Sequence, residues 1–351
     1  MSNATLPRST AVAAPVKARS GRRRVFFGRD ANTVYALIAI IVLASIFVPY
    51  FASATTVNFL LIDAVPILLI AMPMALIIIT GEIDLSVAST AGLSAATLGV
   101  LWHNQHWNIW WIFVVCLLVG ALCGAFNGFL ITVVGLPSLA VTIGTLALYR
   151  GLALVVIGDS AVADFPVDLT SWATSTIGAT GIPTVMIPVT IIVILFAVVL
   201  HFTPFGRALF ALGYSGEAAS FVGIRVNRAK FWLFVSSGVV SSLAGIFWVL
   251  RYSSAQSDSV QGLELSVVAA VLLGGVSVFG GSGGIVGVVA GVLLIRTVNY
   301  ALQLAGLPDT VLTIVTGTLL VLSVIAPSVM ARIRLARSRH KPRPLQGAPA
   351  A

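Results

Sequence analysis

Long apolar segments separated by short polar breaks run through most of the chain. A helix needs about 20 apolar residues to cross the hydrocarbon core of a bilayer. By this measure the sequence predicts about ten transmembrane helices, and we expect an all-α polytopic membrane helix bundle. The predicted spans are residues 34–51, 57–80, 85–102, 110–134, 139–157, 183–202, 231–251, 265–279, 285–304 and 311–327.

The composition supports this interpretation. Hydrophobic residues make up 58% of the 351 residues and charged residues 9%, whereas about a quarter of residues are charged in soluble domains. Basic residues gather in the two tails and one loop, so the net charge of +9 indicates a membrane topology and not a nucleic-acid partner. We expect basic cytoplasmic tails at residues 1–32 and 331–351, a transmembrane domain at 33–330, and a cytoplasmic loop at 204–230 within it.

Two short motifs occur twice. Asp-Leu-Ser-Val at residues 84–87 recurs at 264–267 with Glu in place of Asp, and Gly-Leu-Pro at 135–137 recurs at 306–308. The copies lie five predicted spans apart, an odd number, so the two halves would be inverted in the membrane. Inverted internal repeats with interrupted helices are typical of transporters.

The most polar break in the apolar pattern is residues 81–87. Carboxylates between membrane-length segments are costly to desolvate, which favours a functional role. The structural alternative for Asp84 is an N-cap on the next helix. Asn127 and Asn299 can donate and accept hydrogen bonds, which suits hydroxyl-rich solutes, although such amides also join helices. The candidate translocation-path residues are Glu82, Asp84, Ser86, Asn127, Ser138, Thr142, Glu264, Ser266 and Asn299.

Other conspicuous residues have structural interpretations. Glycines at 120, 124 and 128 share one helix face and predict close helix packing. Arg296 lies in mid-span and needs an acid, a carbonyl or water as its partner, while Asp63 lies near the outer end of its span. His103 and His106 lie among tryptophans, which favours an interfacial belt over a metal site.

The glycine-rich segment at residues 279–284 is not a phosphate-binding loop. No strand is predicted before it, and no lysine of the chain is followed by Ser or Thr. We therefore expect a tight reversal here, and no catalytic residue, metal or cofactor in this chain. A membrane enzyme using Asp159, Asp164 and Asp168 is disfavoured, because their loop has no histidine or phosphate-binding pattern.

Residues 207–227 have the pattern of one short amphipathic helix bounded by glycines, which would either present its polar face to a partner or lie along the membrane. This segment resembles the coupling helix of ABC-importer permeases. Residues 79–87, Ile-Thr-Gly-Glu-Ile-Asp-Leu-Ser-Val, are similar to a signature of the branch that imports ribose, xylose, arabinose, galactose, rhamnose and autoinducer-2. Residues 273–287 match the second, glycine-rich signature of that branch, and the resemblance extends over residues 34–326.

The sequence also departs from that family's pattern. Glu82 stands where the family usually has Gly, Ala88 replaces a common Gly, and Arg296 interrupts an apolar span. These charges put a plain ribose-type assignment in doubt. Glu82 and residues 251–256 look more like the rhamnose or autoinducer-2 permeases.

The resemblance implies an inner-membrane permease subunit of an ABC importer for a monosaccharide or similar small polyol, rhamnose being one candidate. Its implied partners are an ABC ATPase subunit that uses the ATP, a periplasmic or lipid-anchored sugar-binding protein, and a second permease copy or sister permease. Ten crossings would leave both termini in the cytoplasm. The alternative is an ion-coupled secondary transporter in which Glu82, Asp84 or Glu264 titrates. The ATPase-coupling residues would be Gly213, Gly216, Glu217, Ala218, Ala219, Gly223 and Ile224.

Overall fold

The computed structural model describes residues 29–178 and 180–339, so most of both predicted tails lies outside the described residues. Within this part the chain forms helices and no strand, apart from two isolated bridges. The helices are α2 (Arg29–Phe47), α3 (Ala54–Ile79), α4 (Val87–His103), α5 (Ile109–Thr132), α6 (Ser138–Ile157), α7 (Val167–Thr174), α8 (Met186–Phe202), α9 (Pro204–Tyr214), α10 (Gly216–Phe221), α11 (Val226–Tyr252), α12 (Leu263–Leu273), α13 (Ile285–Leu304) and α14 (Asp309–Arg339).

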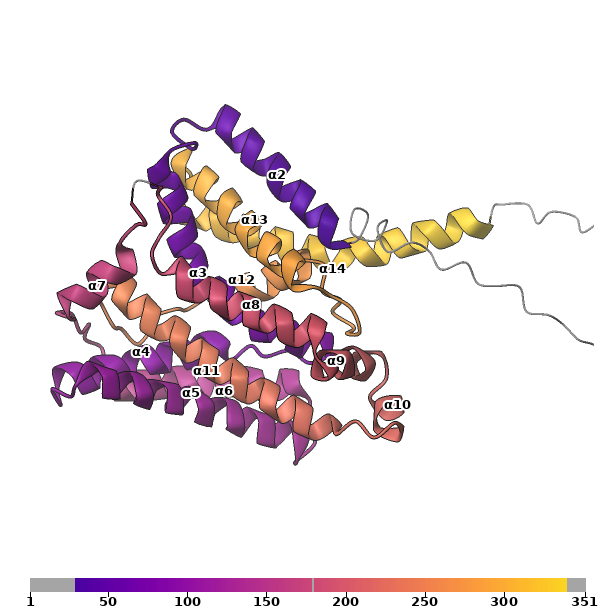
Figure 1. The fold of residues 1–351 in the computed structure, drawn as a ribbon, viewed down its shortest axis with the longest axis horizontal. Helices are drawn as coiled ribbons and strands as arrows, with labels where there is room; N and C mark the ends of the chain where they lie inside the picture. Colours follow the sequence, from indigo (N-terminus) through magenta and orange to yellow (C-terminus); the bar gives the residue numbers. More distant parts are fainter. Residues whose placement is uncertain (1–28, 179, 340–351) are drawn as a thin grey trace, which may run out of the picture.

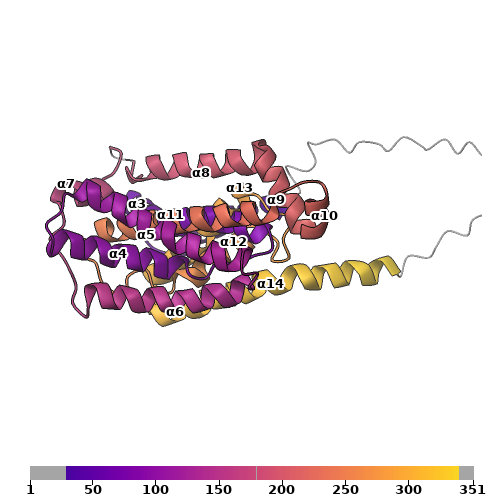
Figure 2. The ribbon, with the colours of Figure 1, turned by 90° about the horizontal axis from the view of Figure 1, so that it is seen from below.

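The helices pack into one bundle around α3. This helix contacts α8, α11, α12 and α13, and 94% of its most apolar 18-residue stretch is buried. Figure 1 shows α2 and α13 on one side of the bundle and α5 with α6 on the other. Helix α7 lies at one end, whereas α9 and α10 lie at the opposite end, from which the last part of α14 projects (Figure 1, Figure 2).

A helix is present at each of the ten predicted spans. Among the described residues, five helices are long and apolar enough to cross a membrane alone: α3, α5, α6, α11 and α13. Helices α8 and α9 count as a sixth if they are one span bent by 68°. Three further apolar helical stretches, Ala31–Phe47, Leu263–Leu273 and Asp309–Ile325, are shorter. The polytopic helical bundle is therefore confirmed, although several of its helices are shorter than a full span.

Two predicted elements were wrong in detail. The eighth span was predicted at residues 265–279, but α12 ends at Leu273 because Gly274 and Gly275 follow, the latter with φ +91°. The single helix predicted over residues 207–227 is two helices, α9 and α10. They are separated at Ser215, whose extended backbone breaks the helix while its hydroxyl accepts a hydrogen bond from the Ala218 N–H at 3.2 Å.

Glycines join α5 to α11, as their spacing predicts. A Cβ atom at Gly120 would collide with the Gly238 carbonyl and the Ser242 hydroxyl, and one at Gly124 would collide with the Phe234 carbonyl. The two backbones approach too closely for any side chain at these positions. The predicted packing role of the glycines in α5 is therefore confirmed.

Helices α4 and α12, at which the repeated Leu-Ser-Val motif lies, run in opposite directions, as inverted repeats require. The break before α4 and the glycine-rich loop after α12 lie at the same end, because the Gly281 N–H donates to the Ile79 carbonyl at 2.9 Å. Helix α4 thus leaves this end and α12 approaches it. The repeated Gly-Leu-Pro motifs also match in geometry, since Gly135 (φ +83°) and Gly306 (φ +80°) each precede a helix start by three residues.

Candidate functional site

The polar break between α3 and α4 is built by residues 80–86. Helix α3 ends at Ile79, and the chain then turns through Gly81, whose φ of +83° is a left-handed conformation that favours glycine. Two side chains of α6 hold the backbone of Ile83 in place. The Ser138 hydroxyl accepts from the Ile83 N–H at 3.3 Å, and the Thr142 hydroxyl donates to the Ile83 carbonyl at 3.3 Å.

Asp84 is the centre of this break. Its side chain is buried, and both carboxylate oxygens are used. Oδ1 accepts from the Ser86 hydroxyl at 2.7 Å and from the Ser86 N–H at 3.1 Å, while Oδ2 accepts from the Ser237 hydroxyl of α11 at 2.8 Å. Three donors therefore replace the water that the carboxylate would lose on burial.

The network continues into α5 and α6. The Asn127 amide nitrogen donates to the Ser86 hydroxyl at 2.8 Å, and the Tyr149 hydroxyl shares its hydrogen between the Asn127 amide oxygen at 3.1 Å and the Cys123 carbonyl at 3.0 Å. Asn127 is thus satisfied on both sides by partners from two other elements. A continuous polar chain from Tyr149 to Ser237 fixes the break against α5, α6 and α11.

The predicted path residues divide into two groups. Glu82, Asp84, Ser86, Asn127, Ser138 and Thr142 lie together at the break, whereas Glu264, Ser266 and Asn299 belong to α12 and α13. Asn299 hydrogen-bonds Thr316 of α14 at 3.3 Å, and Oε2 of Glu264 is buried without a partner.

Asp84 caps the turn that enters α4. Helix α4 begins at Val87 with Ser86 as its N-cap residue, whose side chain makes no capping hydrogen bond. Asp84 lies two residues earlier, and its Oδ1 accepts from the Ser86 N–H as a capping side chain does. Its carboxylate therefore stabilises both the break and the turn from which the next helix starts.

Glu82 forms an ion pair with Lys230, the fifth residue of α11. The two side chains are 17% and 20% exposed, so the pair is largely shielded from solvent. Sequence reasoning missed Lys230, Ser237 and Tyr149. A signal for Lys230 was available, because a carboxylate at membrane depth needs a cation and Lys230 directly precedes an apolar span.

Helices α9 and α10 and the turn after them contain the predicted coupling residues, and we call residues 204–225 the coupling segment. Glu217 and Ala218 are exposed, and Phe221 and Val222 beside them are 89% and 75% exposed. Ala219 is buried, and its carbonyl accepts from the Ile224 N–H at 3.1 Å across a turn through Gly223 (φ +84°). This end of the bundle therefore presents an apolar surface on a compact local fold.

The coupling segment also touches the break directly. A Cβ atom at Gly213 would collide with the Ile79 carbonyl and the Gly281 nitrogen, so α9 lies against both backbones. Gly281 is itself hydrogen-bonded to Ile79. The end of α9, the end of α3 and the glycine-rich loop thus form one contact point. By contrast Gly216 has open space around it.

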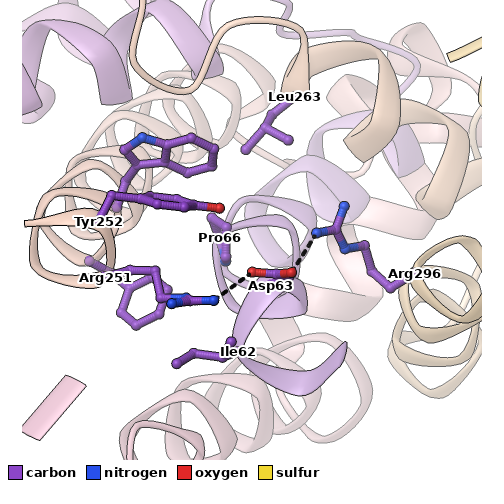
Figure 3. A pocket seen from close by; sticks show the side chains of 9 residues that line it. Ile62, Asp63, Pro66, Arg251, Tyr252, Leu263 and Arg296 are labelled. Carbon is purple, nitrogen blue, oxygen red and sulfur yellow. Dashed lines mark ion pairs between the residues drawn. The ribbon is translucent and has the colours of Figure 1, made fainter. Parts of the chain in front are cut away.

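Another ion cluster lies away from the break, between α3, α11 and α13. Asp63 pairs with Arg251 at 3.5 Å and with Arg296 at 3.6 Å, one oxygen to each guanidinium (Figure 3). Arg296 therefore finds the acid that its mid-span position required. The sequence did not show that Arg251 would share it. The His103 and His106 loop is exposed among exposed tryptophans, as an interfacial belt would be.

Residues 56–324 match a family model described as the branched-chain amino acid transport system permease component. The match covers both the break and the coupling segment. The chain belongs to this permease family.

Relatives of this permease from several bacteria are described as autoinducer 2 import system permeases. It is 36% identical over 299 residues to the autoinducer 2 import system permease protein LsrD of Klebsiella pneumoniae subsp. pneumoniae, covering 84% of this chain and 89% of the relative. It is 34% identical to the LsrD protein of Photorhabdus luminescens, covering 78% and 84%. The corresponding Salmonella typhimurium protein is 33% identical, covering 76% and 81%. No solved structure matches the chain.

Family membership establishes the general activity of this permease. It is a membrane subunit of an ABC import system and not a catalytic enzyme. The buried break then has a clear place in the molecule. It interrupts the helical bundle of an import permease, and hydrogen bonds from α5, α6 and α11 fix it in place.

Proposed function

We propose that this permease is one half of an ATP-driven importer that carries a monosaccharide or similar small polyol across the inner membrane. It would work with an ABC ATPase subunit, a sugar-binding protein on the outside, and a second copy or a sister permease. Autoinducer-2, named for the relatives, and rhamnose are the first two solutes to test. The exposed apolar helices of the bundle leave the surrounding lipid as a further partner.

The contact of α9 with the break carries this proposal. Gly213 lies against Ile79 and Gly281, and Lys230 just beyond the coupling segment pairs with Glu82. A force applied to α9 and α10 therefore acts on the end of α3 without passing through flexible chain. This is what a subunit driven by a separate ATPase needs at the surface that the ATPase touches.

The path role of the break requires it to open. Asp84, Ser86 and Asn127 are each at most 2% exposed, so no solute reaches them in this conformation. We propose that ATPase closure displaces the end of α3 and separates the break from α5 and α11. The hydroxyl, amide and carboxylate groups then become available to a hydroxyl-rich solute.

The proposed orientation places α9, α10 and the ends of the chain in the cytoplasm. Helix α14 leaves the bundle at the end that holds α9 and α10 (Figure 1). The basic tails at residues 1–32 and 331–351 favour the cytoplasmic side. Helix α7 and its acidic loop then face the binding protein outside.

Reconstitution tests the proposal. The permease is placed in proteoliposomes with an ABC ATPase and a sugar-binding protein from the same organism, and uptake of radiolabelled autoinducer-2 and rhamnose is measured. Uptake should require ATP on the coupling-segment side and should stop when the ATPase is omitted. Uptake driven by a proton or sodium gradient through the permease alone would overturn the proposal and favour the secondary transporter.

A further inference from the structure

A small cavity lies between α3, α11 and the start of α12, and it is lined by the Asp63 ion cluster. Its volume is about 70 Å³. Figure 3 shows Arg251 and Arg296 approaching Asp63 from opposite sides, with Tyr252 and Leu263 above them. Neither the path residues at the break nor the coupling residues line it.

The cluster is electrostatically unbalanced. Within the described part of the chain, Asp63 is the one carboxylate that forms an ion pair with Arg251 or Arg296. The three side chains are only 19–24% exposed. One positive charge is thus left without a partner between helices of a membrane protein, where an uncompensated charge is costly. An additional anion would remove that cost.

The guanidinium groups also retain donor capacity. The pairs to Asp63 measure 3.5 and 3.6 Å, longer than the ~2.8 Å of a charge-assisted hydrogen bond. Nε of Arg251 is buried and has no hydrogen-bond partner. An arginine offers five N–H donors in a fixed plane. The donors of the two groups are therefore poorly satisfied by one shared carboxylate.

The size and the walls of the cavity limit the ligand. A volume of about 70 Å³ corresponds to roughly two water molecules, too small for a whole sugar but sufficient for one oxyanion group. The Trp248 and Tyr252 rings lie 4.7 Å apart, tilted by 48°, and form an aromatic wall, and the Arg251 guanidinium lies 5.3 Å from the centre of the Tyr252 ring. Tyr252 is half-exposed, so a larger ligand can extend outward past it.

We propose that the Asp63–Arg251–Arg296 cavity binds the carboxylate of an acidic monosaccharide derivative, whose hydroxylated part extends past Tyr252. The inference rests on the proposed function and names a solute class for it. The bound carboxylate lies beside Asp63 and accepts hydrogen bonds from the guanidinium N–H groups that Asp63 leaves unsatisfied. Because Asp63, Arg251 and Arg296 belong to α3, α11 and α13, the solute would join the same three helices.

A lipid phosphate offers similar oxyanion chemistry, and the experiment must separate the two sources. The purified full-length permease is placed in nanodiscs of phosphatidylcholine alone, and in a second set with added phosphatidylglycerol. Binding of D-gluconate and of D-sorbitol is measured by calorimetry. These probes have the same six-carbon polyol framework and differ in the carboxylate.

In phosphatidylcholine nanodiscs the permease should bind gluconate at least about tenfold more tightly than sorbitol, the discrimination expected of one charge-assisted hydrogen-bonded group. Equal affinities, or no binding of gluconate, would overturn the proposal. Loss of gluconate binding only in phosphatidylglycerol would also support it, because the lipid competes for the site. Stabilisation by phosphatidylglycerol with no gluconate binding in either set would assign the cavity to lipid and overturn it.

Three variants locate the effect. Arg296→Gln should abolish the preference for gluconate. Arg228→Gln removes the same charge from the exposed start of α11 and should leave the preference unchanged. Asp63→Asn should tighten gluconate binding several-fold, because the competing carboxylate is gone. A purely structural ion cluster predicts no such gain, so unchanged or weaker binding in a folded Asp63→Asn protein contradicts the proposal.

These measurements use the permease alone, without its ATPase. Failure of gluconate binding therefore leaves ATP-driven import of neutral sugars intact as a function. Conversely, failure of ATP-driven uptake in the reconstitution leaves a measured gluconate preference standing. The wild-type comparison of the two probes needs no variant and decides the proposal even if Asp63→Asn does not fold.

Discussion

At the scale of single residues, Asp84 shows how the permease tolerates a carboxylate in a membrane bundle. Its oxygens accept three hydrogen bonds, from two groups of Ser86 and from Ser237. Ser86 belongs to the break and Ser237 to α11, so the carboxylate acts as a common acceptor that keeps the break closed. A residue chosen from sequence for solute contact thus also has a structural role.

Substitution of Asp84 tests this structural role. Asp84→Ala leaves the Ser86 and Ser237 hydroxyls without their acceptor and should destabilise the protein by on the order of 3 kcal/mol. Asp84→Asn keeps one acceptor oxygen and the side-chain volume, so it should cost less. Thermal unfolding of the purified permease in detergent measures both. Equal unfolding temperatures for wild type and Asp84→Ala would show that the network does not stabilise the fold.

The Glu82–Lys230 ion pair can be tested by exchange of its charges. Glu82→Lys and Lys230→Glu should each impair uptake, because each leaves two like charges in a shielded position. The double variant restores an opposite pair and should recover a substantial part of the uptake. A double variant no better than the worse single variant would show that the two side chains act independently.

At the scale of elements, the sequence located the helices well and their ends less well. Hydrophobic length predicted all ten apolar helices, because a membrane demands long uninterrupted apolar runs. It failed at residues 274–279, which are apolar enough to extend the eighth span but contain the glycines that end α12. The split between α9 and α10 was missed because it depends on the backbone of Ser215, which hydropathy does not describe.

The same limit applies to the site. Polar residues in apolar surroundings singled out Asp84, Ser86 and Asn127, which the structure joins in one network. Their partners Ser237 and Tyr149 come from distant helices. One sequence without an alignment holds no information on which helix faces which. Pairings such as Glu82 with Lys230 therefore emerged only from the three-dimensional arrangement.

Glycine substitutions test the packing of α5 on α11. Gly124→Ala introduces a methyl group that collides with the Phe234 carbonyl, so it should destabilise the protein by about 2 kcal/mol or more. Gly144→Ala is the matched control in α6, where the added methyl group meets no atom within 4 Å. It should be neutral or stabilising by up to about 1 kcal/mol through helix propensity. Thermal unfolding in detergent compares the two, and similar losses would contradict close packing.

At the scale of the whole molecule, the bundle has two functionally different ends. Helices α9 and α10 lie at one end, and α7 with its flanking residues 158–166 and 175–178 lies at the other (Figure 2). The proposed path and the α9 contact both lie along the α3 and α11 pair that connects these ends. A subunit built in this way can receive its solute at one end and its driving force at the other.

Docking of the ATPase should depend on the exposed coupling surface. Ala218→Trp places a large side chain beside the exposed Phe221 and should abolish co-purification of the ATPase, while membrane insertion stays intact. Ser171→Trp makes the same kind of change on exposed α7 at the opposite end and should leave co-purification unchanged. Normal recovery of the ATPase with Ala218→Trp would refute the assigned docking surface.

The burial of α3 has a consequence for how the protein is made. This helix is among the most hydrophobic of the chain, yet the finished bundle shields it almost entirely from lipid. Its neighbours α8, α11, α12 and α13 are all synthesised after it. During translation α3 must therefore enter the bilayer before these neighbours exist. Its apolar side chains make this insertion favourable. The apolar surface of α3 thus contacts lipid during insertion and is covered by other helices in the mature protein.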